Sequence, residues 1–171
     1  MLFRVAAMLV VFIAACGPFI PHSYSQCRHS LIIRQFPARN TLARYCIPRD
    51  GCFSLSFIHS VSQTPVRDDY RIEADRIVQV AETFQTHEAG LPSLEQEADA
   101  LGWEWQDGQF LLHMRRQIHH LVMRTDRLYR NRLHLADRTI DLNQWDDQAL
   151  ELSIEKHRDN HDPLFNKENT P

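Results

Sequence analysis

The side chains whose types and spacing point to chemistry are His59 and Asp68. Each lies in a stretch where apolar residues alternate with polar ones, as in a β-strand whose successive side chains point to opposite faces. Each of the two occupies the same alternate positions as the apolar residues of its strand. Both side chains are therefore expected on the buried face. If residues 62–65 form a four-residue loop, His59 faces Asp68 and Phe57 faces Tyr70. The sequence then predicts an imidazole and a carboxylate paired inside one hairpin.

Two roles are open for this pair. It forms a structural lock that holds the turn together with Thr64, or it lines a pocket for a polar ligand together with Tyr70 and Ser60. A catalytic role is not expected, because adjacent strand residues point to opposite faces and His59 cannot act as the base of Ser60. The nucleophile-elbow motif GxSxG is also absent from the sequence.

The composition argues against several classes of function. With 19 basic and 22 acidic residues the formal net charge is −3, so the chain lacks the positive field typical of nucleic acid binding. It has five glycines and no phosphate-binding loop or dinucleotide motif. Neither CxxC nor HExxH occurs, and His113 and His119 are separated by a predicted turn at residues 115–117. We therefore expect no metal, no cofactor and no enzymatic activity.

Residues 1–16 have the features of an export signal. A basic residue precedes an apolar run over 5–15, which is about half the length that a transmembrane helix needs. Residues 13–16, IAAC, match the bacterial lipobox, in which the cysteine is lipidated and becomes the new N-terminus. We expect a lipidated Cys16 that anchors the protein to the membrane on the periplasmic side of the cell envelope. A plain cleaved signal, or an uncleaved anchor that extends to Ile20, are the alternatives.

Three further cysteines, Cys27, Cys46 and Cys52, could form disulfides in such an oxidising compartment. Cys46 and Cys52 flank Asp50-Gly51, a dipeptide typical of hairpin turns. One expectation is therefore a bridge between these two, with Cys27 left over. The other is that both are small buried apolar residues.

Short strands separated by turns account for most of the chain from residue 30 onward. This spacing predicts an all-β fold, either a small antiparallel β-sandwich or a partly open barrel. The expected strands are 31–33, 42–47, 52–60, 70–74, 76–86, 110–114, 118–124, 128–135 and 138–142, with a turn near Asp75 and a loop or single helical turn over 91–107. The expected organisation is a lipoprotein signal peptide over 1–15, a tether over 16–29, a β domain over 30–152 and a disordered tail over 153–171.

Two segments, 59–70 (HSVSQTPVRDDY) and 88–92 (EAGLP), carry a resemblance to a known family. They resemble HSVxxTPVxExY and GAGLP, two signatures of the bacterial domain-of-unknown-function 1850 (DUF1850) family, and the resemblance covers residues 30–152. The chain departs from these patterns where Asp68 replaces a glutamate and Glu88 replaces a glycine. The second change places a negative charge beside Gly90, Leu91 and Pro92, which argues against anion binding by that loop.

The resemblance implies a small extracytoplasmic β domain of the kind encoded beside, or fused to, permeases of the tripartite ATP-independent periplasmic (TRAP) transporter class, in its TAXI subclass. From this we expect a non-enzymatic accessory lipoprotein that docks on a TAXI-type permease or solute-binding protein. The alternative is an independent periplasmic module that binds a small ligand or an envelope component through His59, Asp68 and Tyr70. A hydrolase is the least favoured hypothesis.

Overall fold

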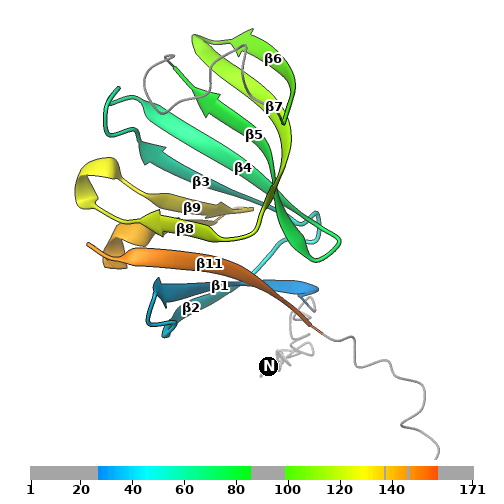
Figure 1. The fold of residues 1–171 in the computed structure, drawn as a ribbon, viewed down its shortest axis with the longest axis vertical. Coiled ribbons are helices and arrows are strands. Elements are labelled where there is room, and N and C mark those ends of the chain that lie inside the picture. Colours follow the sequence, from blue (N-terminus) through cyan, green and yellow to red (C-terminus); the bar gives the residue numbers. More distant parts are fainter. Residues whose placement is uncertain (1–26, 86–98, 137, 146, 158–171) are drawn as a thin grey trace, which may run out of the picture.

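The structure is a computed structural model that describes residues 27–85, 99–136, 138–145 and 147–157. Its strands form two antiparallel sheets (Figure 1). The smaller sheet has the order β2 (Thr41–Cys46), β1 (His29–Phe36), β11 (Ala149–Lys156) and β8 (Leu121–Arg124). The larger sheet has the order β10 (Arg138–Asp141), β9 (Arg132–Leu135), β3 (Cys52–Ile58), β4 (Pro65–Glu73), β5 (Arg76–Phe84), β7 (Gln109–Ile118) and β6 (Ala100–Gln106). Two short 3-10 helices, η1 (Arg127–Tyr129) and η2 (Leu142–Trp145), lie in the connections.

This architecture confirms the prediction of an all-β antiparallel fold. The larger sheet runs from β10 to β6, and these two edge strands do not pair with each other in the part of the chain that the structure describes. The two sheets therefore form an open sandwich and not a closed barrel. Among the described residues, no helix is long and apolar enough to span a membrane.

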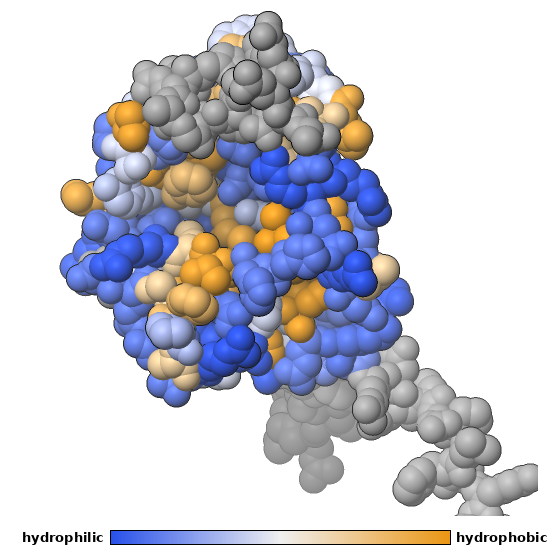
Figure 2. Space-filling model, in the orientation of Figure 1, coloured by the Kyte–Doolittle hydropathy of each residue, from blue (hydrophilic) through white to orange (hydrophobic). Residues whose placement is uncertain are grey.

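An apolar core lies between the sheets because alternate side chains of each strand point inward. Leu31 and Leu152 of the smaller sheet and Phe53, Leu55 and Leu133 of the larger one are at most 3% exposed. A second buried cluster lies on the larger sheet alone, and its members are Val66, Phe84, Leu112 and Met114. The space-filling view shows further apolar residues near the middle of one face of the molecule, with hydrophilic residues around them (Figure 2). Burial of each large side chain contributes about 1.5–3 kcal/mol.

The β4–β5 and β6–β7 hairpins close with two-residue turns. Residues 74–75 join β4 to β5, and residues 107–108 join β6 to β7, with φ angles between 46° and 78°. Positive φ at both positions is what a type I′ hairpin turn requires, and the predicted turn near Asp75 is confirmed. The hairpin predicted at Asp50-Gly51 is wrong, because β2 and β3 belong to different sheets and this dipeptide lies in the crossing between them.

The β domain extends beyond both of the boundaries predicted for it, residues 30 and 152. His29, predicted in the tether, begins β1, and the tail predicted from residue 153 is wrong over 153–156, which belong to β11. The two segments pair with each other from His29 opposite Lys156 to Phe36 opposite Ala149. Pairing with β1 satisfies the backbone hydrogen bonds of residues 155–156. Their charged side chains gave no indication that they belong to a strand. Residues 1–26 and 158–171 lie outside the described residues.

β6 and β7 differ from the sequence prediction as well. Residues 100–106 form β6 where a loop or a helical turn was expected, and β7 continues through the turn predicted at 115–117. β6 is an edge strand paired only with β7. Its residues are exposed or only partly buried, so few of them need apolar cover and its sequence has little apolar pattern. Trp103 supplies that cover, since its ring meets the ring of Phe84 edge-on with centroids 5.9 Å apart.

The disulfide joins Cys27 to Cys46, so the predicted Cys46–Cys52 bridge is wrong. β1 and β2 are hydrogen-bonded neighbours, and Ile47 N donates to His29 O at 3.0 Å just beyond the end of their ladder. This contact places Cys27 beside Cys46, with a Cα–Cα distance of 5.6 Å that a disulfide can span. Cys52 begins β3 in the other sheet and is a free thiol.

Candidate functional site

The β3–β4 hairpin holds the residues predicted to do chemistry, and its register differs from the prediction by four residues: Asp68 lies opposite Leu55 where His59 was predicted. Phe53 lies opposite Tyr70 and Leu55 opposite Asp68, and the ladder ends where Ile58 meets Pro65. The loop therefore has six residues, 59–64, where four were assumed. Since a shift by an even number of residues keeps every side chain on its face, the predicted buried face is confirmed and the predicted partners are wrong.

His59 lies in the loop and bonds within it. Its backbone N donates to Thr64 O at 2.9 Å, and Gln63 N donates to His59 O at 2.9 Å. The ring Nδ1 lies 3.3 Å from Ser62 N and 3.2 Å from Ser62 Oγ, which in turn lies 2.8 Å from Thr64 Oγ1. Ser60 is exposed, and its carbonyl accepts from Gln63 Nε2 at 2.6 Å. His59 thus organises its own turn, and the predicted His59–Asp68 pair is wrong.

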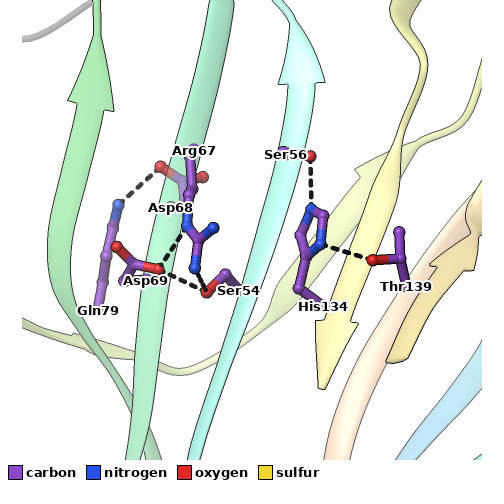
Figure 3. Close-up of polar contacts among 8 residues, drawn as sticks. All are labelled: Ser54, Ser56, Arg67, Asp68, Asp69, Gln79, His134 and Thr139. Carbon is purple, nitrogen blue, oxygen red and sulfur yellow. Dashed lines mark hydrogen bonds and ion pairs between the residues drawn. The ribbon is translucent and has the colours of Figure 1, made fainter. Parts of the chain in front are cut away.

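Asp68 lies on the inner face of the larger sheet, where two neutral donors hold it. Tyr70 Oη donates to one carboxylate oxygen at 3.2 Å, and Gln79 Nε2 donates to the other at 3.1 Å. The Gln79 contact is visible in Figure 3. Burial raises the pKa of Asp68 to about 6, although the bond from Tyr70 and the charge of Arg116 oppose this rise. Asp68 therefore exchanges a proton in the mildly acidic range.

Tyr70 is the most buried polar member of this group, at 4% exposure. Its ring stacks on Phe53 with centroids 5.1 Å apart, which orients the hydroxyl toward Asp68. Burial, followed by the charge of Asp68, raises the pKa of the Tyr70 phenol. The phenol therefore stays protonated and remains a hydrogen-bond donor. The sequence predicted that Asp68 and Tyr70 share a face, and the structure brings them together.

The opposite face of the same two strands carries a charged network. Arg67 Nε donates to Asp69 Oδ1 at 2.9 Å, and a terminal nitrogen of Arg67 donates to Ser54 Oγ at 2.9 Å (Figure 3). Ser54 Oγ also donates to Asp69. Asp69 is thus paired with a cation, and its side chain is 31% exposed. Its neighbour Asp68 is hydrogen-bonded to neutral donors instead.

A serine and a histidine meet farther along this outer face. Ser56 Oγ lies 2.8 Å from His134 Nε2, and His134 Nδ1 lies 3.2 Å from Thr139 Oγ1 (Figure 3). Burial, followed by the charge of Arg67, lowers the pKa of His134, so the ring is neutral at pH 7. The distances suit a nucleophile and its base, but the third group is a hydroxyl, which cannot stabilise an imidazolium as a carboxylate does. These hydrogen bonds have no signal in the sequence, because Ser56 and His134 are 78 residues apart and meet only through the β3–β9 ladder.

A model of the family described as "Domain of unknown function (DUF1850)" matches residues 53–142 of this chain. The match covers both Asp68 and Tyr70 and ends at Leu142, the first residue of η2. The chain belongs to the DUF1850 family. No curated protein and no solved structure matches it.

The other predicted site residues of this DUF1850 protein are placed as follows. Gly90, Leu91 and Pro92 of the second signature, and the lipidation candidate Cys16, lie outside the described residues. Within the described ranges, no group of three or more histidine, cysteine or acidic side chains could hold a metal ion. Residues of the first signature thus take part in a polar cluster on each face of the β3–β4 hairpin. Asp68 belongs to the inner cluster and Asp69 to the outer one.

Proposed function

We propose that this DUF1850 protein is a non-enzymatic accessory protein of a TAXI-type TRAP uptake system, tethered to the periplasmic side of the envelope through lipidated Cys16. Two features of the sequence support this proposal. The lipobox-like residues 13–16 suit an exported lipoprotein, and the family's signatures resemble those of domains encoded beside such transporters. The partner would be the permease or the solute-binding protein.

The observation that carries the non-enzymatic part is how the polar residues of the first signature are used. Asp68 is held by Tyr70 and Gln79, and His59 bonds to Ser62 of its own loop. These contacts lie within β4, between β4 and β5, and within the β3–β4 loop, so they support the local fold. The lock between His59 and Asp68 that one sequence hypothesis described does not form. Because these signature residues support the fold, we assign the proposed role to the surface of the domain, as in a docking protein.

The test is affinity purification of the full chain from native membranes, with mass spectrometry of its partners and of its own N-terminus. We expect an acylated Cys16 together with subunits of a TAXI-type system. Cys16→Ala should lose both the acyl group and the enrichment of those subunits. Cys52→Ala is the matched control, because Cys52 is a free thiol within the β domain and its loss should change neither result.

Two outcomes contradict the proposal in different ways. An acylated protein that recovers no transporter subunit would point to an independent module that binds a small ligand or an envelope component. If instead the protein is not acylated and Cys16→Ala leaves its membrane association unchanged, Cys16 is not a lipid tether.

A further inference from the structure

A cavity of about 270 Å³ lies apart from the β3–β4 hairpin, where three segments of the chain meet. Its wall is formed by residues 27–28 before β1, by residues 45–49 at the end of β2 and beyond it, and by Leu135, Ala136 and Arg138 where β9 meets β10. Neither of the polar clusters described above lines it. The cavity is therefore a separate candidate site.

Three arginines line this cavity, and each comes from a different segment. Arg28 precedes β1, Arg49 follows β2 and Arg138 begins β10. No acidic side chain is found among the cavity-lining residues that the structure describes. Like charges gathered around a small space repel one another, so an anion placed between them would be bound favourably.

The remainder of the wall is largely apolar. Ile47 and Leu135 are each 3% exposed, and Tyr45 and Pro48 complete this side of the cavity. The planar guanidinium group of arginine matches the oxygen pairs of phosphate and carboxylate. The lining therefore suits a ligand with an oxyanion at one end and a short apolar part at the other.

The backbone that carries two of the arginines is fixed in place. The Cys27–Cys46 disulfide ties the residue next to Arg28 to the end of β2, and Arg28 O accepts from His157 N at 2.9 Å. Gly51 N donates to Pro48 O at 2.9 Å, which closes the turn that carries Arg49. Because these segments need not be ordered when a ligand arrives, less of the binding free energy is spent on ordering them.

We propose that this cavity binds an oxyanion, a phosphate or carboxylate group with an apolar part attached, between Arg28, Arg49 and Arg138. The same chemistry is offered by two sources, the headgroup region of an anionic phospholipid and a soluble organic anion. Cys27 follows Cys16 by eleven residues, which span at most about 40 Å when extended. With Cys16 tethered as proposed above, lipid headgroups are within reach of the cavity.

The experiment titrates the full chain, purified in a neutral detergent, with hexyl phosphate, with hexanoate and with dihexanoyl phosphatidylglycerol. Hexanol is the uncharged control, and binding is measured by calorimetry and by the shift in Tm. We expect at least one anion, but not hexanol, to bind and raise Tm. The double variant Arg28→Gln/Arg138→Gln should weaken that binding by about tenfold or more, because each arginine bond to an anion is charge-assisted.

The matched control is Arg76→Gln/Arg124→Gln, which removes the same charge from arginines that do not line this cavity. It should bind as the unsubstituted protein does. Binding of phosphatidylglycerol alone assigns the site to a lipid headgroup, and binding of a soluble anion assigns it to a free ligand. The proposal is overturned if no anion binds, or if the cavity variant binds as tightly as the control. This measurement uses purified protein, so its failure is distinct from a failure to recover transporter subunits.

Discussion

Asp68 and Asp69 are neighbours in the sequence, yet the two faces of one strand give them opposite surroundings. Asp68 points inward, where Tyr70 and Gln79 are its hydrogen-bond donors and burial raises its pKa to about 6. Asp69 points outward and is paired with Arg67 at 2.9 Å, with Ser54 as a further donor. The inner carboxylate is solvated by neutral dipoles and the outer one by a cation and water.

The comparison shows that hydrogen bonds alone do not offset the cost of burying a charge. Two donors contact Asp68, yet desolvation is the largest influence on its pKa. The inner cluster therefore makes the stability of the fold depend on pH, whereas the outer network contributes the small free energy typical of a surface ion pair.

Asp68→Asn should have the largest effect and should be stabilising at high pH. A rise in the Asp68 pKa from 3.8 to about 6 on folding means that the folded state holds the proton more tightly than the unfolded state. The stabilisation from Asp68 is fully present below about pH 4 and is lost as the pH rises through 6. At pH 8 the buried charge costs about 3 kcal/mol, so Asp68→Asn should raise the free energy of unfolding by up to that amount, as measured by urea denaturation.

At pH 4 the same substitution should change the free energy of unfolding by less than about 1 kcal/mol, because Asp68 is then largely protonated. Asp69→Asn is the control and should destabilise by about 0.5–1 kcal/mol at pH 8 through loss of the Arg67 pair. If Asp68→Asn instead destabilises the protein at pH 8, the bonds from Tyr70 and Gln79 outweigh the cost of burial.

Tyr70→Phe should have the next largest effect, because it removes a donor from the buried carboxylate and leaves the packing on Phe53. We expect a loss of about 2 kcal/mol at pH 8, where Asp68 is ionised, and a smaller loss at pH 4, where the bond joins two neutral groups. Tyr129→Phe removes a hydroxyl that bonds to no other described residue and should change stability little at either pH. Equal losses from Tyr70→Phe at the two pH values would show that the hydroxyl does not serve the charged form of Asp68.

Ser56→Ala should have the smallest effect, because the outer chain of Ser56, His134 and Thr139 is partly open to water. We expect a loss of about 0.5–1 kcal/mol with the same pH dependence of unfolding as the unsubstituted protein. We also expect no change in the hydrolysis of a small ester such as p-nitrophenyl acetate. A fall in ester hydrolysis on Ser56→Ala would make the outer face, and not the inner one, the chemical site.

The sequence predicted which face of each hairpin strand is buried more reliably than which residues meet. Alternation placed Phe53, Leu55 and Tyr70 on the inner face, and the structure agrees. The partners were wrong because they depend on where the loop lies, and the polar residues of this region carry no signal that separates a loop over 62–65 from one over 59–64. The Ser56–His134 contact and the Cys27–Cys46 disulfide had no local signal at all, since each joins different strands or segments.

The all-β class, the turn near Asp75 and the shared face of Asp68 and Tyr70 were determined by the sequence alone, because each follows from side-chain alternation or from residues adjacent along the chain. Tertiary structure decided the strand register, the disulfide partner and the meeting of Arg28, Arg49 and Arg138 around one cavity. These features join residues that are distant in the chain, so they depend on the order of strands in the sheets, which a local pattern does not encode. The charge of Asp68 shows the same division: the sequence supplies the carboxyl group, and its burial beside Tyr70 and Gln79 in the folded protein raises its pKa.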